Sequence, residues 1–362
     1  MVRRLEHRFF VVVCISFIFF LAFYWYSGMQ TLVTVKTIET GLVDTKFGDF
    51  GPSESQILGQ KVRILCLVLT GPKNIIKVRS VKDTWGRRCN KLLFVSSEVG
   101  NDTSLGIVAL QNVSEGRNFL WAKTKQSFRY VWDNHMNDAD WFMKADDDTY
   151  VVLDNLRHFL KDYDTHQPIY FGCKFNPDKT KLYASGGAGY VLSKESVRRF
   201  IEEALPNKKN CSAVPGGSED LEMGKCLRNV GVELGDSRDK LGKHRFMALA
   251  PDRLVARYPS YPIPAWYKKY MAYPQGESLE CCSQSAISFH YVTPPNMYVL
   301  EFLIYHLYPI GVGNDPGKSF IRPELTAISQ ATTTTTTITS KPLNSTKIVM
   351  ISPVINTTKL VA

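Results

Sequence analysis

The stretch that decides the fold is DWFMKADDDTYVVL, residues 140–153. It opens with a largely apolar run, DWFMKA (140–145), and continues into three adjacent carboxylates, Asp146, Asp147 and Asp148. An apolar run that ends abruptly in polar residues is typical of a strand buried on both faces of a sheet. We therefore expect a strand that presents acidic side chains at its carboxyl end, where α/β sheets bind their ligands.

Further strands and helices are expected on both sides of this stretch. The predicted strands are RILCLVLT (63–70), KLLFVSS (91–97), GIVALQN (106–112), PIYFGCKF (168–175) and the glycine-rich SGGAGYVLS (185–193). Helical spacing joins Leu120, Thr124, Phe128 and Val131, then Leu153, Leu156 and Leu160, and finally Val197, Phe200, Ile201 and Leu205 behind a Ser193 cap. A helix is also expected to begin near Tyr150. This alternation indicates an α/β domain with a parallel or mixed sheet covered on both faces.

The N-terminal region has the features of a membrane anchor. FFVVVCISFIFFLAFYWY is an uncharged run of 18 residues between Arg8 and Ser27, about the shortest helix that spans a hydrocarbon core of roughly 30 Å. Arginines precede it and an aromatic cluster, Tyr24 to Tyr26, forms its far end, which places the N-terminus in the cytosol. The alternative is a cleaved signal peptide, whose apolar core is usually about 7 to 15 residues.

The rest of the chain divides by composition. The segment after the anchor lacks periodicity and reads as a stem, whereas the C-terminal segment is rich in Thr and reads as disordered. The predicted segments are a cytosolic tail (1–8), a transmembrane anchor (9–27), a stem (28–60), a lumenal domain (61–325) and a disordered Thr-rich tail (326–362).

Composition limits the classes of function. With 44% hydrophobic and 22% charged residues among 362, the chain is globular rather than wholly disordered. Its formal charge of +10 favours anionic partners, but a lumenal domain meets no nucleic acid. Five sequons agree with lumenal exposure, and they lie at Asn101, Asn112, Asn210, Asn344 and Asn356. Seven of the eight cysteines follow the anchor, so at least one stays free or pairs between chains.

The three aspartates are the first candidates for chemistry. Adjacent carboxylates repel one another unless a cation lies among them, and an Asp-x-Asp pair suits a hard divalent ion such as Mn²⁺ or Mg²⁺ that also holds a diphosphate. Capping of the next helix by Asp148 or Thr149 is the alternative, and the two interpretations are compatible. His290, in AISFHYV, is a candidate third ligand, although a lone His is more often an ordinary surface or core residue.

Two other places carry candidate site residues. Asp220 lies at a predicted helix start after two glycines, where a carboxylate serves equally well as a general base or as an N-cap. Phosphate-binding candidates gather at the entry to another helix, and the alternative is that these side chains are simply solvated. They are Glu115, Gly116, Arg117 and Lys123.

Taken together, the motifs resemble the core 1 β1,3-galactosyltransferases of glycosyltransferase family 31. The resemblance runs in order from about Lys61 to about Pro309, and its strings include KVRILCLVLTGP, RCNKLLFVSS, DADWFMKADDDTYVVLDNLR, PIYFG, SGGAGYVLSKE, SEDLEMGKC, GDSRD and CCSQSAISFHYV. It implies a type II Golgi membrane enzyme of GT-A fold. The implied reaction is transfer of galactose from UDP-galactose, with inversion and with Mn²⁺, to the 3-hydroxyl of GalNAc on Ser or Thr of glycoproteins.

The resemblance also implies roles for individual residues. The metal ligands are Asp146, Asp148 and His290, and the base that deprotonates the acceptor hydroxyl is Asp220. The residues that contact the donor are Leu69, Glu115, Gly116, Arg117, Lys123, Asp146 and Tyr291. The acceptor sugar stacks on Trp266, where an indole face covers the apolar side of the ring. The implied disulfides are Cys66–Cys89, Cys211–Cys226 and Cys281–Cys282, which leaves Cys173 as the free lumenal cysteine.

Two rival functions remain at this point. One is a family 31 transferase with another donor or acceptor, and the other is a catalytically inactive lumenal chaperone. Retention of Asp146, Asp148, Asp220 and His290 argues against an inactive protein. A second copy of the chain and a lumenal chaperone are the protein partners that the resemblance suggests.

Overall fold

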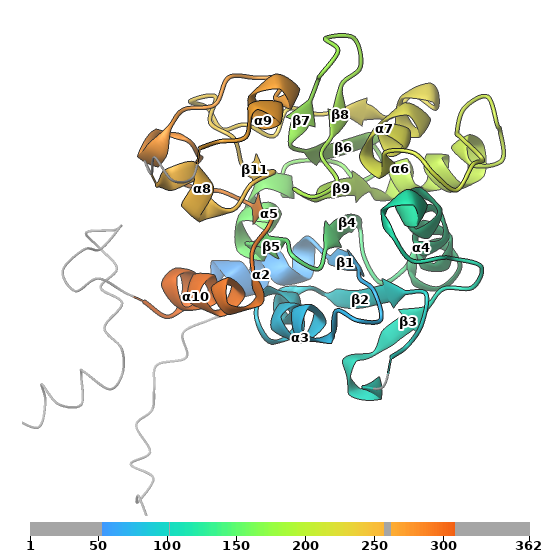
Figure 1. The fold of residues 1–362 in the computed structure, drawn as a ribbon, viewed down its shortest axis with the longest axis horizontal. Coiled ribbons are helices and arrows are strands. Elements are labelled where there is room, and N and C mark those ends of the chain that lie inside the picture. The colour runs from blue at the N-terminus through green and yellow to red at the C-terminus, as the bar shows by residue number, and fades with distance from the viewer. Residues whose placement is uncertain (1–52, 101, 257–261, 308–362) are drawn as a thin grey trace, which may run out of the picture. The chain divides into compact units, whose positions relative to one another are not determined.

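The computed structural model describes residues 53–307 except 101 and 257–261 (Figure 1). The predicted cytosolic tail (1–8), anchor (9–27), most of the stem (28–52) and the Thr-rich tail (326–362) lie outside the described residues. Within the described part, no helix is both long and apolar enough to cross a membrane. The chain divides into two compact units, Met1–Met297 and Tyr298–Ala362.

A seven-stranded mixed sheet lies at the centre of the first unit, in the order β10-β6-β9-β4-β1-β2-β3. Its strands are β1 (Ile64–Leu69), β2 (Lys91–Ser96), β3 (Ile107–Ala109), β4 (Trp141–Asp146), β6 (Ile169–Gly172), β9 (Tyr190–Ser193) and β10 (Glu233–Leu234). β3, β2, β1 and β4 are parallel neighbours, whereas β9 runs antiparallel to both β4 and β6. The predicted α/β domain with a mixed sheet is confirmed.

Two small sheets accompany the large one among the described residues. One has the order β11-β12-β5 and consists of β11 (Phe246–Met247), β12 (Ser288–Phe289) and β5 (Tyr150–Val151). The other pairs β7 (Lys174–Phe175) with β8 (Tyr183–Ala184). The first of these sheets matters for function because it joins the segment after β4 to a segment about 140 residues later in the chain.

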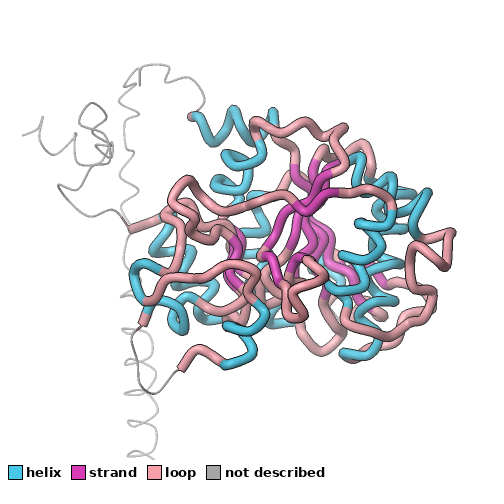
Figure 2. Tube along the Cα trace, turned by 90° about the horizontal axis from the view of Figure 1, so that it is seen from above, coloured by secondary structure: helices cyan, strands magenta, loops and turns pink. Residues whose placement is uncertain are grey.

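Helices lie on both sides of the strands (Figure 2). They are α2 (Glu54–Lys61), α3 (Ile75–Asp83), α4 (Leu120–His135), α5 (Leu153–Leu160), α6 (Lys194–Arg199), α7 (Glu219–Asn229), α8 (Pro251–Val255) and α9 (Ala265–Tyr270). The last described helix, α10 (Pro294–Tyr305), begins in the first unit and ends in the second. Short 3₁₀ turns supplement them, and α6 continues into a π-helical turn at Phe200–Ala204. Ser193 caps α6 as predicted, because its Oγ accepts the N–H of Ser196 at 3.1 Å.

The main core lies between the sheet and the group α4, α6 and α7. All six residues of β1 are buried, as expected of a strand covered on both faces. Rings of α4 meet the π-helical turn, where Phe200 lies 5.7 Å from Phe128 and 6.1 Å from Trp121 between centroids. Full burial of such a side chain stabilises a fold by about 1.5–3 kcal/mol. This packing holds the sheet edge that carries the acidic turn.

The structure corrects one expectation about a strand and two about helices. The predicted strand 185–193 is regular only at Tyr190–Ser193, and residues 185–189 form a loop. The helix expected near Tyr150 begins instead at Leu153, and residues 150–151 form β5. Pairing with the distant β12 stabilises this strand, and periodicity within the chain cannot reveal such a partner. The third difference is α2, a helix inside the range 28–60 that was expected to lack regular structure. A capping box between Ser53 and Gln56 starts this helix.

Three disulfides occur among the described cysteines. They join Cys66 to Cys89, Cys211 to Cys226 and Cys281 to Cys282, the same pairs that the resemblance implies. The remaining described cysteine, Cys173, is buried with a free thiol 3.8 Å from the sulfur of Met271. Burial raises the pKa of the Cys173 thiol to about 12, so it stays protonated and unreactive at neutral pH.

The disulfides differ in how much chain they close, and this predicts unequal effects on stability. Cys66 and Cys89 are separated by 23 positions, whereas Cys281 and Cys282 are adjacent. In the loop-closure account, removing the first pair costs about 2–4 kcal/mol and removing the adjacent pair costs much less. We expect urea unfolding of the two double Cys→Ala variants to show this difference. Each variant loses two sulfur atoms, so equal losses would contradict the account.

Candidate functional site

The acidic turn after β4 lies at the carboxyl edge of the parallel strands. The register aligns Asp146, the last residue of β4, with Leu69, the last residue of β1. Thr149 closes the turn, because its N–H donates to the carbonyl of Asp146 at 3.1 Å and its Oγ1 accepts the N–H of Asp146 at 3.2 Å. The same hydroxyl donates to the carbonyl of Gly187 at 2.8 Å. The helix-capping alternative for Asp148 or Thr149 is therefore wrong, since α5 begins after Val152.

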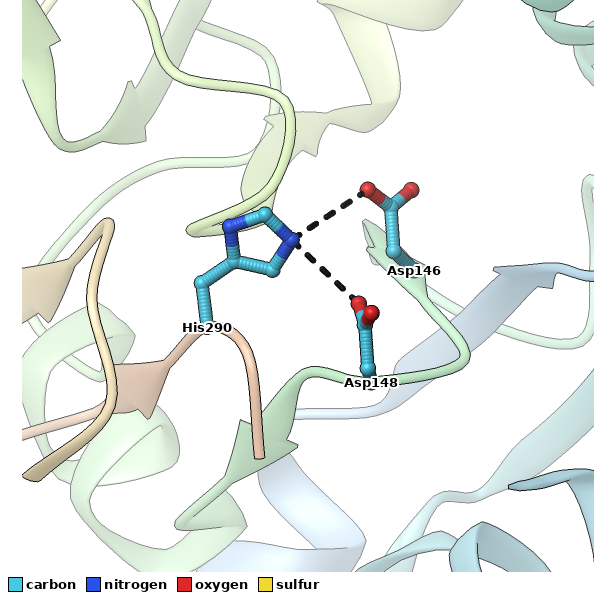
Figure 3. A group of neighbouring side chains, drawn as sticks. All are labelled: Asp146, Asp148 and His290. Carbon is cyan, nitrogen blue, oxygen red and sulfur yellow. Dashed lines mark ion pairs between the residues drawn. The ribbon is translucent and has the colours of Figure 1, made fainter. Parts of the chain in front are cut away.

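The pairing of β5 with β12 brings His290 to this turn. Phe289 lies opposite Tyr150 in the antiparallel register, so the residue after it reaches the aspartates. The Nε2 atom of His290 lies 3.2 Å from Oδ1 of Asp148 and 3.9 Å from Oδ2 of Asp146 (Figure 3). Residues far apart in the sequence thus form one cluster.

The cluster of Asp146, Asp148 and His290 has the chemistry of a divalent metal site. One ligand atom from each residue lies within 4.8 Å of the others, and all three side chains are partly buried. Figure 3 shows the imidazole facing both carboxylates. The second oxygen of Asp146 accepts from the ammonium of Lys144 at 2.7 Å, which leaves Oδ2 on the side of His290. Carboxylate and imidazole ligands together suit ions such as Mn²⁺.

Asp148 is held in its ionised form. Burial alone raises the pKa of this carboxyl, but a hydrogen bond and the charge of His290, together with Lys77, outweigh burial and lower the pKa to about 2. The Nζ atom of Lys77 lies 3.1 Å from Oδ2 of Asp148. At neutral pH the carboxylate is therefore available as a ligand.

Asp147 has a different environment from its two neighbours. Its Oδ2 accepts from the hydroxyl of Thr70 and from the amide of Asn74, both at 2.7 Å, and its Oδ1 accepts from Lys77 at 3.0 Å. The side chain is buried, and burial raises the pKa of Asp147 against the opposing effect of these donors. The middle aspartate ties the acidic turn to the segment after β1 and is not a ligand candidate.

Asp220 lies in the first turn of α7 and faces the loop 185–189. Its Oδ2 accepts the N–H of Gly186 at 3.0 Å, and its Oδ1 accepts the N–H of Leu221 at 2.9 Å. The N-cap residue of α7 is Ser218, so the capping interpretation of Asp220 is not supported. Burial raises the pKa of Asp220, and the two backbone donors offset only part of this. A carboxylate with a raised pKa is a stronger general base.

The glycine-rich loop 185–189 lies between the candidate base and the candidate metal site. A Cβ atom on Gly186 would lie 2.5 Å from Oε2 of Glu219, and one on Gly187 would lie 2.1 Å from the ring of His290. Side chains do not fit at either position, and the backbone of the loop packs closely against Glu219 at Gly186 and against His290 at Gly187. The loop therefore contacts Asp220 through the N–H of Gly186 and packs against His290 at Gly187.

The predicted phosphate-binding residues meet near the end of β1. Buried Lys123 donates to the carbonyl of Thr70 at 2.8 Å and to the two oxygens of Glu115 at 2.7 and 2.8 Å. Glu115 also accepts the N–H of Ser97 at 3.0 Å. The structure thus brings Glu115 and Lys123 beside Thr70, which follows Leu69. The ammonium of Lys123 is therefore already paired with acceptors of the protein itself.

Gly116 and Arg117 follow Glu115 in an exposed segment. Gly116 has a φ of 109°, a region that favours glycine, and it precedes the 3₁₀ turn that begins at Arg117. No side chain is present at Gly116 to shield the backbone, and Arg117 is exposed. Both residues are therefore accessible to a ligand.

The two aromatic residues predicted for the site, Tyr291 and Trp266, are both exposed. Tyr291 is half exposed and stacks on the His290 ring at a centroid distance of 3.8 Å. Trp266, on α9, is 39% exposed and meets the edge of Phe175 at 6.4 Å. Phe175 in turn contacts Tyr183 at 5.9 Å. Tyr183 lies on β8, which packs against α7, so these aromatic contacts lead from Trp266 toward the helix that carries Asp220.

A cavity of about 460 Å³ lies beside α9 rather than at the metal cluster. Residues that line it include Tyr267, Lys268, Met271, Tyr273, Gln275 and Glu277. The residues predicted for donor or metal binding do not line this cavity.

Sequence reasoning missed two charged residues of the site. Lys144 and Glu219 are both buried; Lys144 donates to the metal candidate Asp146, and Glu219 accepts from Lys144. The available signal is Lys144 itself, a charged residue inside a strand that is expected to be buried on both faces. Such a residue requires a charged partner, which the sequence does not identify.

Comparison with known proteins gives close relatives. A model of the Fringe-like family matches residues 74–297. The glycoprotein-N-acetylgalactosamine 3-beta-galactosyltransferase 1 of Xenopus laevis is 43% identical over 257 residues, which cover 70% of this chain and 69% of that protein. Chondroitin sulfate synthase 3 of Mus musculus is 27% identical over 187 residues, which cover 45% of this chain and 20% of that enzyme. A solved structure of LgtC is 11% identical, has a TM-score of 0.36 and covers 64% of this chain and 88% of its own.

Proposed function

This chain belongs to the Fringe-like family and is homologous to the glycoprotein-N-acetylgalactosamine 3-beta-galactosyltransferases, and we propose on that premise that it forms core 1 O-glycans. It is a β1,3-galactosyltransferase that transfers galactose from UDP-galactose to the 3-hydroxyl of GalNAc on Ser or Thr. The observation that carries this proposal is the convergence of Asp146, Asp148 and His290 at the carboxyl edge of β4, with Asp220 of α7 held against the adjoining loop by the N–H of Gly186.

The donor occupies the edge of the sheet in a GT-A arrangement. Asp146, Asp148 and His290 hold Mn²⁺, and the segments around Leu69 and Glu115 to Lys123 receive the nucleotide. When bound, Mn²⁺ stabilises the negative charge that develops on the diphosphate. Tyr291 and the backbone at Gly116 and Arg117 complete the donor site. The clustering of the three ligand atoms supports the metal assignment.

Asp220 acts as the general base. Its carboxylate accepts the proton of the GalNAc 3-hydroxyl as that oxygen attacks the anomeric carbon of galactose. A new carbon–oxygen bond forms on one face while the bond to the diphosphate breaks on the other, so UDP leaves and the configuration inverts. The raised pKa of Asp220 and its fixed position against Gly186 support this role. Trp266 covers the apolar face of the acceptor sugar.

A donor and acceptor screen tests the reaction. We expect the full-length chain, purified in detergent with Mn²⁺, to release UDP from UDP-galactose when a GalNAc-serine peptide is present. Release should be at background level with the unglycosylated peptide, with UDP-GlcNAc or with UDP-GlcA. Preference for another donor would assign a different family 31 reaction, and binding of the peptide without turnover would assign the inactive chaperone.

We also propose that the domain is lumenal and held in the Golgi membrane by residues 9–27. The homology to an enzyme of glycoprotein O-glycans supports this location. Among the predicted glycosylation sites, Asn112 is exposed and Asn210 partly exposed, while Asn101, Asn344 and Asn356 lie outside the described residues. Protease digestion of sealed microsomes is expected to spare the domain, and its degradation would refute the topology.

A further inference from the structure

Lys144 is a buried cation at the centre of the site. It lies on β4 between Leu67 of β1 and Tyr190 of β9, and its side chain is only 3% exposed. The ammonium lies 2.7 Å from Oδ1 of Asp146, 3.2 Å from the carbonyl of Gly186 and 3.4 Å from an oxygen of Glu219. These three acceptors match the three donors of an ammonium group.

Glu219 is fixed by the protein and is not directed at a substrate. Its Oε1 accepts the hydroxyl of Tyr190 at 2.6 Å and the hydroxyl of Thr124 at 3.1 Å. Its Oε2 faces Lys144, and the side chain is buried. A buried carboxylate with this many protein partners serves to hold its counterion in place.

Two of the three partners of Lys144, Asp146 and Gly186, lead to different parts of the candidate machinery. Asp146 uses Oδ1 for the ammonium, so its Oδ2 is directed to the side where His290 lies at 3.9 Å. Gly186 uses its carbonyl for the ammonium, while its N–H donates to Asp220. One side chain therefore contacts a candidate metal ligand directly and the candidate base through a single glycine.

We propose that Lys144, anchored by Glu219, is a positioning residue that orients Asp146 for the metal and Asp220 for the acceptor hydroxyl. The proposal rests on the transferase function above. Residues that contact a metal ligand from outside orient that ligand, and their loss typically lowers metal affinity by about 10- to 100-fold. Lys144 itself contacts neither metal nor substrate.

Substitution of Lys144 by Met, which has similar length and no charge, tests the role. We expect Lys144→Met to lower the affinity for Mn²⁺, titrated calorimetrically at saturating UDP, by about 10- to 100-fold. We expect kcat to fall with it, because the base loses its fixed position, while KM for the GalNAc peptide stays unchanged. Unchanged Mn²⁺ affinity and unchanged kcat in a folded variant would overturn the proposal.

Loss of Lys144 alone leaves the carboxylates of Glu219 and Asp146 without their cation and threatens folding. The double variant Lys144→Met with Glu219→Gln removes both charges of the buried pair and keeps the shapes. We expect it to fold and still to bind Mn²⁺ weakly, because Asp146 remains without its partner. Recovery of wild-type affinity in the double variant would mean that Lys144 only neutralises Glu219, and would overturn the positioning role.

Lys225 offers a matched control. This lysine of α7 also pairs with a carboxylate, Glu222, at 2.6 Å, but the pair is only partly buried and contacts none of the candidate ligands. Lys225→Met should retain Mn²⁺ affinity and kcat. Because the readout is metal affinity, it stays informative if the natural donor or acceptor differs from the one proposed above, which the donor screen decides separately.

Discussion

Asp220→Asn is expected to lower the rate of galactose transfer by about 10²- to 10⁴-fold, the usual contribution of general-base catalysis. Asn has the shape of Asp and keeps an oxygen that can accept the N–H of Gly186, so the loop should stay in place. What it loses is the ability to take a proton. The affinity for UDP and Mn²⁺, measured by calorimetry, should therefore remain that of the wild type.

Glu222 serves as the control acid. It lies in the same helix as Asp220 and pairs with Lys225. Glu222→Gln should retain activity, since this side chain contacts none of the candidate ligands named above.

A pH profile provides a second readout. The base must be ionised to act, so kcat/KM should rise with pH through the pKa of Asp220, and burial places that rise above the ordinary range of Asp. Near-wild-type turnover of Asp220→Asn would remove Asp220 from the role of base.

His290→Ala is expected to lower the affinity for Mn²⁺ by at least the roughly 10- to 100-fold that follows loss of an outer partner of a metal ligand. The imidazole faces both carboxylates of the cluster, so its removal deletes one of the three proposed protein ligands. The affinity for UDP measured in the presence of Mn²⁺ should fall in parallel, because the proposed metal would join the diphosphate to the protein. The affinity for UDP measured without metal should equal that of the wild type.

Asp148→Ala should have the same two effects, although this carboxylate also holds Lys77 and its removal disturbs the acidic turn. His290 therefore gives the cleaner result. His166 is a suitable control because it is exposed and pairs with Asp164 away from the cluster. Retained affinity for both Mn²⁺ and UDP in His290→Ala would exclude this histidine from the metal site.

The sequence predicted those parts of the fold that depend on local pattern. β1 and β4 were predictable because continuous apolar runs are typical of central strands, and both strands are almost wholly buried. The buried face of α4 follows from its helical spacing. β5 was not predictable, since its two residues owe their conformation to pairing with β12, about 140 residues away.

The same contrast applies to the site. The Asp-x-Asp pair is local and was visible in the sequence, whereas His290 had no better standing than any other histidine until the resemblance was considered. Its position depends on β12, which carries no pattern of its own. Lys144 is the converse case, because its place in a buried strand signals a partner but leaves Glu219 unidentified.

The loop 185–189 has a consequence for how such enzymes diversify. Gly186 and Gly187 leave no space for a side chain, so substitutions there would disturb the contacts with Glu219 and His290, on both sides of the candidate site. By contrast, α9 presents exposed Trp266 on one side and a cavity on another, with few constraints from the chemistry. Selection for new acceptors, in nature or in a library, should therefore accumulate substitutions in residues 263–277 and spare Gly186 and Gly187.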